Sequence, residues 1–181
     1  MQDTIRKKGT KKSQIWVSAV LYLVLGIVAI SLILAAIIPV VNRMKDRNIF
    51  AQTKDLMFTL DETIRTVASE GPGSQRELAP FTVSAVYLFI NDTSDNIIWT
   101  METSAVIAEP NTQIQEGALN ITLQDTKIKG RYIIKLLLPY NNIDLAISSS
   151  IANPISGKYS LIVKHAGFNP LVGPIIEFRV V

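Results

Sequence analysis

Few residues of this 181-residue chain could take part in catalysis, and they form no known catalytic pattern. His165 is the only histidine and the chain has no cysteine, which excludes a thiol nucleophile, a cysteine metal site and a disulfide framework. We expect His165 to be an exposed turn residue at the end of a strand. No phosphate-binding loop, Gly-x-Ser-x-Gly, Ser-x-x-Lys or His-x-x-x-His motif is present, and the carboxylates are scattered along the chain. The sequence therefore predicts no enzyme, no cofactor and no metal site.

The residue types at one junction predict chemistry in which the chain itself is the substrate. The run Lys11-Lys12-Ser13-Gln14 stands directly before an uncharged apolar segment. This arrangement suits a peptidase at the cytoplasmic membrane face, because the small Ser13 fits a narrow pocket and the lysines hold the site at the lipid headgroups. Cleavage before Gln14 would remove residues 1–13 as a basic leader and leave a helix with a free amine. A plain basic flank of a signal anchor is the alternative, and Lys7-Lys8-Gly9 offers a second cutting position.

The apolar segment itself predicts a transmembrane helix over residues 14–41. From Ile15 to Val41 the chain carries no charged residue, and this run exceeds the ~20 residues that a spanning helix needs. The apolar region of an ordinary secretory signal has only ~7–15 residues. Cleavage at Ala35-Ala36, which an ordinary signal peptide would imply, is therefore the less favoured interpretation.

The distribution of charge predicts the orientation of this helix. Five basic residues precede the span and three follow it closely: Arg6, Lys7, Lys8, Lys11 and Lys12, then Arg43, Lys45 and Arg47. The positive-inside rule favours a cytoplasmic N-terminus, and the long C-terminal part is then extracellular, at the cell membrane. These flanks account for the net charge of +3. Because the basic leader lacks interleaved aromatic residues, we expect no binding of nucleic acid.

The helix is predicted to continue beyond the membrane as an amphipathic segment over residues 42–70. Its apolar residues are mostly three or four positions apart, which places them on one helix face: Met44, Phe50, Leu56, Met57, Leu60, Ile64 and Val67. Gly71-Pro72-Gly73 predicts the end of the helix, and Pro39 predicts a kink near the outer edge of the span. The apolar face must lie against a β domain, against neighbouring copies, or against both.

After Gly73 the pattern changes to short runs rich in Ile, Val, Leu, Tyr and Thr, separated by turn residues. Seven such runs are predicted strands: 81–90, 96–101, 119–123, 131–138, 143–147, 159–163 and 175–181. One helical region followed by strands defines an α+β class, with a long N-terminal helix and a C-terminal antiparallel β domain over residues 71–181. A β-sandwich and a single curled sheet both fit this pattern.

The leader and helix resemble those of archaeal type IV pilin-like proteins with class III (prepilin-type) signal peptides. The resemblance rests on Lys11-Lys12-Ser13 before Gln14-Ile15-Trp16-Val17 and on Tyr22 within the span. It looks closest to pilin-like proteins of small-genome archaea, with Gly71-Pro72-Gly73-Ser74-Gln75-Arg76 after the helix and a Gly130-Arg131-Tyr132 strand, and less securely Gly157-Lys158-Tyr159. The resemblance implies a prepilin peptidase as a partner, and self-association or assembly with other pilins in a surface filament.

One position departs from that family. A glutamate usually stands five residues into the mature helix, and here that position is Ser18. In the family this carboxylate meets a neighbour's N-terminal amine inside the membrane, where an unpaired charge is costly. Ser18 therefore favours a minor pilin, pseudopilin or pilin-like surface protein over a major pilin. The alternative function is a membrane-anchored β module that binds a cell-surface partner or glycan without polymerising.

Three further sets of residues have predicted roles. Small residues allow close helix packing in lipid, and the span offers Ala19, Gly26, Ala29, Ala35 and Ala36. Asn91-Asp92-Thr93 and Asn120-Ile121-Thr122 are sequons for N-glycosylation if the β domain is exported. Arg76, beside the Gly-Pro-Gly turn, either bonds the last carbonyls of the helix or is a solvated turn residue.

Overall fold

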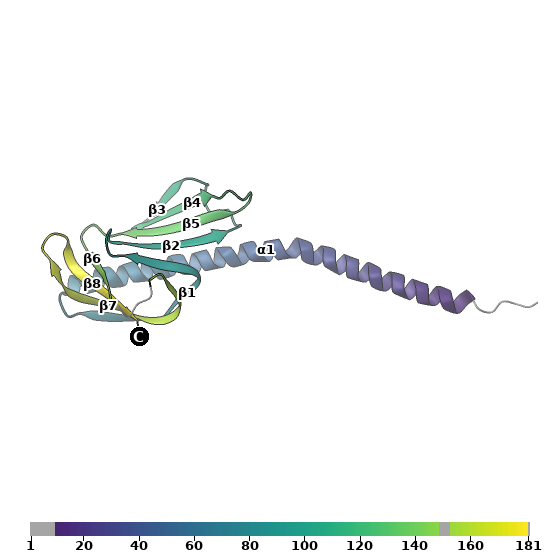
Figure 1. Cartoon of the computed structure of the whole chain (residues 1–181), viewed down its shortest axis with the longest axis horizontal. Coiled ribbons are helices and arrows are strands. Elements are labelled where there is room, and N and C mark those ends of the chain that lie inside the picture. The colour runs from purple at the N-terminus through teal and green to yellow at the C-terminus, as the bar shows by residue number, and fades with distance from the viewer. Residues whose placement is uncertain (1–9, 149–152, 181) are drawn as a thin grey trace, which may run out of the picture. The chain divides into compact units, whose positions relative to one another are not determined.

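The computed structural model describes residues 10–148 and 153–180, without the side chains of residues 10–15 and 84–86. The element order is α1 (Thr10–Glu70), β1 (Gln75–Asn91), β2 (Asn96–Thr103), β3 (Gln113–Glu116), β4 (Leu119–Asp125), β5 (Tyr132–Pro139), β6 (Asp144–Ile147), β7 (Ile155–Asn169) and β8 (Gly173–Val180). One long helix followed by a sheet confirms the α+β layout (Figure 1). The chain divides into two compact units, residues 1–42 and residues 43–181, and α1 contributes to both.

In the first unit, the described residues form helix alone. Every side chain described in this unit, from Trp16 to Asn42, is exposed. This segment is the one described helix that is long and apolar enough to cross a membrane, with a mean hydropathy of 3.0 over its best window. Pro39 lies inside the helix, which is assigned as α on both sides of it, and the kink at Pro39 stays a prediction.

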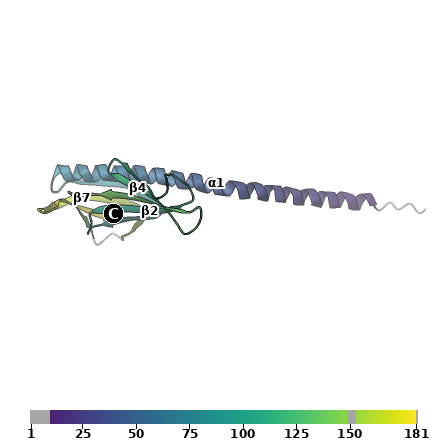
Figure 2. The same cartoon turned by 90° about the horizontal axis from the view of Figure 1, so that it is seen from above.

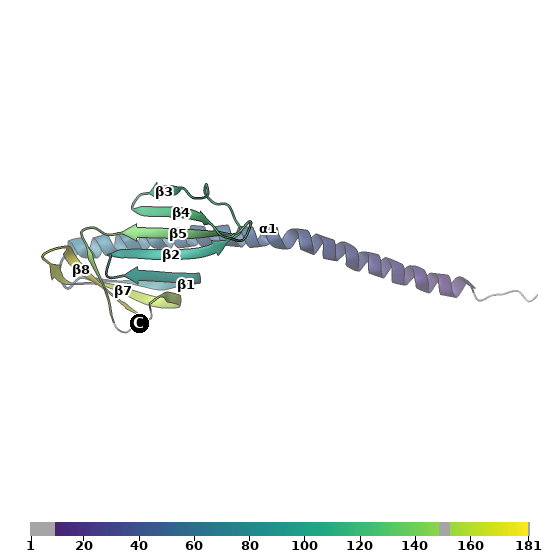
Figure 3. The ribbon, with the colours of Figure 1, turned by 45° about the horizontal axis from the view of Figure 1, so that its top comes forward.

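The second unit packs the remainder of α1 against one face of an eight-stranded sheet. The strand order is β3-β4-β5-β2-β1-β7-β8-β6. Figure 3 shows β3, β4, β5, β2 and β1 side by side with the helix behind them, and Figure 2 shows the helix along one side of the strands. Of the two predicted arrangements, the structure has the single sheet and not the β-sandwich.

Alternation along each strand directs one set of side chains toward α1. In β2, Ile97, Trp99 and Met101 are buried, whereas the residues between them are partly exposed. From the helix, the predicted apolar face contributes four residues with no exposed surface: Met57, Leu60, Ile64 and Val67. Met44, which the same pattern included, is 66% exposed and belongs to no core cluster. The helix face is therefore buried only where the sheet covers it.

The sheet differs from the predicted one in three respects. β6 pairs with β8 in parallel, so the domain is mostly rather than wholly antiparallel. β3 was not predicted, because its four residues Gln113–Glu116 are all exposed and lack an apolar pattern. β1 and β7 are both longer than expected. β1 passes through Pro80, where its register against β7 shifts.

Candidate functional site

The small residues of the apolar helix occupy a partial stripe. At 3.6 residues per turn, Ala19, Gly26, Ala29 and Ala36 lie within about 100° of one another, whereas Ala35 lies on the opposite side. All five are exposed, and a Cβ atom built on Gly26 would meet no atom within 4 Å. This face is free of intrachain contacts and allows close approach of another helix.

The predicted processing site lies partly outside the described residues. Lys11, Lys12, Ser13 and Gln14 are within the first turns of α1, but their side chains are not described, and residues 1–9 lie outside the described part of the chain. Ser18, two residues beyond Trp16, the first helical residue whose side chain is described, is exposed. Cleavage before Gln14 therefore stays a prediction.

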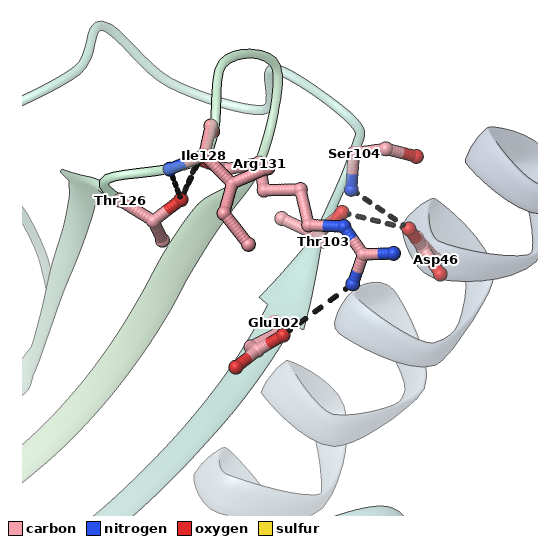
Figure 4. Close-up of polar contacts among 7 residues, drawn as sticks. All are labelled: Asp46, Glu102, Thr103, Ser104, Thr126, Ile128 and Arg131. Carbon is pink, nitrogen blue, oxygen red and sulfur yellow. Dashed lines mark hydrogen bonds and ion pairs between the residues drawn. The ribbon is translucent and has the colours of Figure 1, made fainter.

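A polar contact fixes the beginning of the second unit to the sheet. One oxygen of the Asp46 carboxylate accepts a hydrogen bond from the Thr103 hydroxyl at 2.9 Å and another from the Ser104 backbone N–H at 3.1 Å (Figure 4). The Thr103 hydroxyl in turn accepts a bond from the Ala105 N–H at 2.9 Å. Thr103 is buried, so its polar side chain depends on these partners.

Two further contacts join the helix to the domain. Lys54 pairs with Glu116 of β3 at 2.9 Å, in an exposed position where an ion pair contributes little stability. Asp61 accepts hydrogen bonds from the Arg65 Nε at 2.9 Å, and the Arg65 guanidinium lies 5.6 Å from the centre of the Tyr140 ring. The bond to Asp61 raises the pKa of Arg65. Burial, reinforced by the Asp61 charge, raises the pKa of Tyr140 well above its ordinary value of 10.0.

The predicted end of the helix is observed, with a different residue at its carbonyls. α1 ends at Glu70, and Gly71 and Gly73 both have φ of 93°, in the left-handed region that favours glycine. The Ser74 hydroxyl donates to the Val67 carbonyl oxygen at 3.0 Å. Arg76 instead pairs with the carboxylate of Glu70. Ser74, not Arg76, therefore bonds a carbonyl of the last helical turn.

The prediction for His165 is wrong. This histidine is 3% exposed, lies within β7 and faces Ile176 of β8. The cause is the extent of β7, which continues to Asn169 and places the residue inside the sheet. Its Nδ1 has no hydrogen-bond partner among the described residues, and no group of three or more potential metal ligands occurs among them.

The two sequons occupy different environments. Asn91 ends β1 in the turn to β2, where its side-chain oxygen accepts bonds from the N–H groups of Thr93 at 3.0 Å and Ser94 at 3.2 Å. Asn120 lies within β4, paired with Gln115 on β3 and Leu137 on β5. Only Asn91 is therefore in an open turn, and its modification stays a prediction.

Several hollows lie on the described surface, and the one along the apolar helix measures about 400 Å³ and is lined by Trp16, Val17, Val20, Leu21 and Val24. A pocket of about 280 Å³ is lined by Arg65, Ala68, Ser69, Asn142, Ile143 and Pro174, and another of about 210 Å³ by Ile49, Gln52, Thr53, Leu56, Pro80 and Thr82. Neither of these two pockets brings together a nucleophile and a base. The exposed apolar helix is therefore the candidate functional surface of the described chain.

Comparisons with protein-family models, with curated proteins and with solved structures find no match to this chain. The fold combines one long helix with a β domain. The first part of the helix is a candidate membrane anchor, and its second part belongs to the core of the β domain.

Proposed function

We propose that the chain is a structural subunit (a pilin, minor pilin or pseudopilin) of an archaeal type IV pilus-like surface filament, and Ser18 favours the minor pilin or pseudopilin. In this proposal the leader is cytoplasmic, a prepilin peptidase cleaves before Gln14, and the β domain is extracellular. The apolar helices then pack laterally, either with copies of the same chain or with other pilins.

The observation that carries this proposal is the division of α1 between two environments. The helix continues from an exposed apolar segment into a segment whose apolar face forms the core of the β domain. A simple anchor has no need of this second segment, because ~20 apolar residues suffice to span a bilayer.

The exposed surface of the first segment also supports association. Its large side chains are 48–75% exposed, from Val28 and Ile37 to Trp16, and such a surface must be covered by lipid or by other helices. In lipid, helices associate through close packing, hydrogen bonds and lipid entropy, and small residues are enriched at the contact. Ala19, Gly26, Ala29 and Ala36 supply such a face.

Ser18 favours a second candidate function, a non-polymerising anchored β module that binds a cell-surface partner or glycan. Without a carboxylate at this position, a neighbour's N-terminal amine has no charged partner inside the filament. The anchored module has the same span, topology and fold as the pilin-like subunit and differs only in assembly.

Electron microscopy of material sheared from the cell surface distinguishes the two functions. Gold-labelled antibodies against residues 71–181 are expected to decorate filaments in the sheared fraction. If the chain is found only as dispersed molecules in the membrane fraction, the anchored module is favoured. A prepilin peptidase and an assembly ATPase encoded in the same genome are a further expectation.

A further inference from the structure

The β4–β5 hairpin presents an exposed apolar residue between lysines. Its turn reads Lys127-Ile128-Lys129-Gly130-Arg131, and all five residues are exposed, with Ile128 at 62%. An isoleucine exposed at the tip of a turn contributes nothing to the core of the domain. Alternation of basic and apolar side chains is typical of segments that lie at the surface of an anionic membrane.

Hydrogen bonds within the turn hold Ile128 in this position. The N–H of Arg131 donates to the Ile128 carbonyl at 3.0 Å, and the N–H of Thr126 donates to the Arg131 carbonyl at 3.2 Å. The Thr126 hydroxyl accepts from the Ile128 N–H at 3.2 Å and lies 2.8 Å from the Arg131 carbonyl oxygen (Figure 4). Gly130 has φ of 79°, a conformation that a residue with a side chain rarely adopts. The tip is therefore a preformed element.

The same end of the second unit contains the basic residues at the beginning of its helix. Asp46 is bonded to Thr103 and Ser104, Thr103 pairs with Tyr132 across the β2–β5 ladder, and Arg131 Nη1 lies 3.6 Å from Glu102 (Figure 4). Arg43, Lys45 and Arg47 flank Asp46 and are exposed. Arg43 is three residues, about 4.5 Å of helix rise, before Asp46. Helix and hairpin thus contribute to one basic end.

The balance of charge at this end is positive. The start of the helix and the hairpin turn together carry six basic residues, and the acidic residues of these and the adjoining segments are Asp46, Glu102, Glu109 and Asp125. Asp46 is engaged by Thr103 and Ser104, Glu102 by Arg131, and Asp125 by the Asn111 side chain. Among the described residues, no salt bridge includes Lys127, Lys129 or the three helix cations. These cations are available to an external anionic surface.

We propose that this basic end rests on anionic lipid headgroups, with Ile128 inserted among them and Lys127, Lys129 and the helix cations beside lipid phosphates. The chain itself favours this partner, because Arg43 follows the candidate membrane span in sequence after a single intervening residue. The proposal rests on the membrane anchoring in the proposed function but not on polymerisation. It also gives a role to cations that the positive-inside rule disfavours outside the cell.

A single-cysteine probe tests this contact, because the natural chain has no cysteine. Ile128→Cys is labelled with an environment-sensitive fluorophore in the full chain and reconstituted into nanodiscs. One set contains phosphatidylcholine alone, and the other contains phosphatidylcholine mixed with phosphatidylglycerol. The matched control is Leu171→Cys, which places the same label at a 94% exposed apolar residue in the β7–β8 turn.

We expect a several-fold increase in fluorescence and a blue shift at position 128 only in the anionic discs. High salt, or the added pair Lys127→Ser and Lys129→Ser, is expected to reduce both. A label at 128 that stays in water in both lipids, while the chain is in the discs, overturns this proposal alone. An equal response at 171, or an equal response in both lipids, also overturns it. Failure of the chain to enter the discs overturns this proposal and the anchoring together.

Discussion

The Asp46 carboxylate accepts hydrogen bonds from the side chain of Thr103 and from the next backbone N–H, at 2.9 and 3.1 Å. This places a helix residue against the end of β2, at the first turn of the second unit. This contact engages the buried Thr103, whereas the Lys54–Glu116 pair between helix and sheet is exposed.

Asp46→Ala is expected to lower the free energy of unfolding by about 1–3 kcal/mol, because the buried Thr103 hydroxyl loses a partner. Urea denaturation of the full chain in detergent micelles measures this change. Asp55→Ala, at an exposed position of the same helix, is the control and is expected to change the value by less than about 0.5 kcal/mol. Equal effects of the two substitutions would show that the Asp46 contact is not stabilising.

Ile64→Ala is expected to cost about 2–5 kcal/mol, because Ile64 has no exposed surface and packs between helix and sheet. Trp99 is buried in the same core and reports its unfolding by fluorescence in a Trp16→Phe background, since the chain has only two tryptophans. Thr59→Ala, on the exposed side of the helix, is the matched control. A loss below about 1 kcal/mol for Ile64→Ala would contradict the helix–sheet packing.

The raised pKa of Tyr140 predicts that the folded chain loses stability at high pH. Burial and the Asp61 carboxylate raise the pKa of Tyr140 in the folded chain, whereas the unfolded chain ionises near the ordinary value of 10.0. Above about pH 10 the unfolded state therefore binds fewer protons, and this group lowers the unfolding free energy by up to about 1.4 kcal/mol per pH unit. Below pH 10 its contribution is constant.

Tyr140→Phe is expected to remove this part of the pH dependence, measured by urea denaturation at several pH values between 9 and about 11.5, below the range in which arginine titrates. Tyr87→Phe, at a 59% exposed residue, is the control and keeps the wild-type slope. The same slope for Tyr140→Phe and wild type would contradict the role of Tyr140.

Gly26→Leu is expected to reduce the yield of sheared filaments strongly, because a large side chain on the small-residue face keeps neighbouring helices apart. A Cβ atom at position 26 meets no atom of the chain within 4 Å, so a loss of filaments reports on neighbouring helices. Val24→Leu, on the opposite side of the helix by the same geometry, is the matched control. Full assembly of the Gly26→Leu variant would exclude this face from the filament contact.

The sequence predicted the features that depend on local pattern. The uncharged run from Ile15, the apolar helix face through Val67 and the stop at Gly71-Pro72-Gly73 all follow from periodicity or backbone preference, and the structure has each of them. Seven of the strands were also visible as apolar runs. These signals require no knowledge of partners distant in sequence.

The features that were missed depend on partners distant in sequence. β3 is an exposed polar edge strand that exists because β4 pairs with it, and His165 is buried because β7 continues beyond its apolar run. Asp46 joins the helix to the sheet only because it accepts a hydrogen bond from Thr103, which lies 57 residues later in the chain. Polar residues reveal such roles only when the fold brings their partners together.

The proposed function requires that the apolar part of α1 is freed of a leader so that it can pack in lipid and in a filament. Mass spectrometry of the N-terminal peptide of the membrane-extracted chain tests this claim most directly. We predict a mature chain that begins at Gln14, and Ser13→Leu is expected to block this cleavage while the chain remains in the membrane. An intact Met1, or a mature start inside the apolar run after Ile15, would contradict the claim.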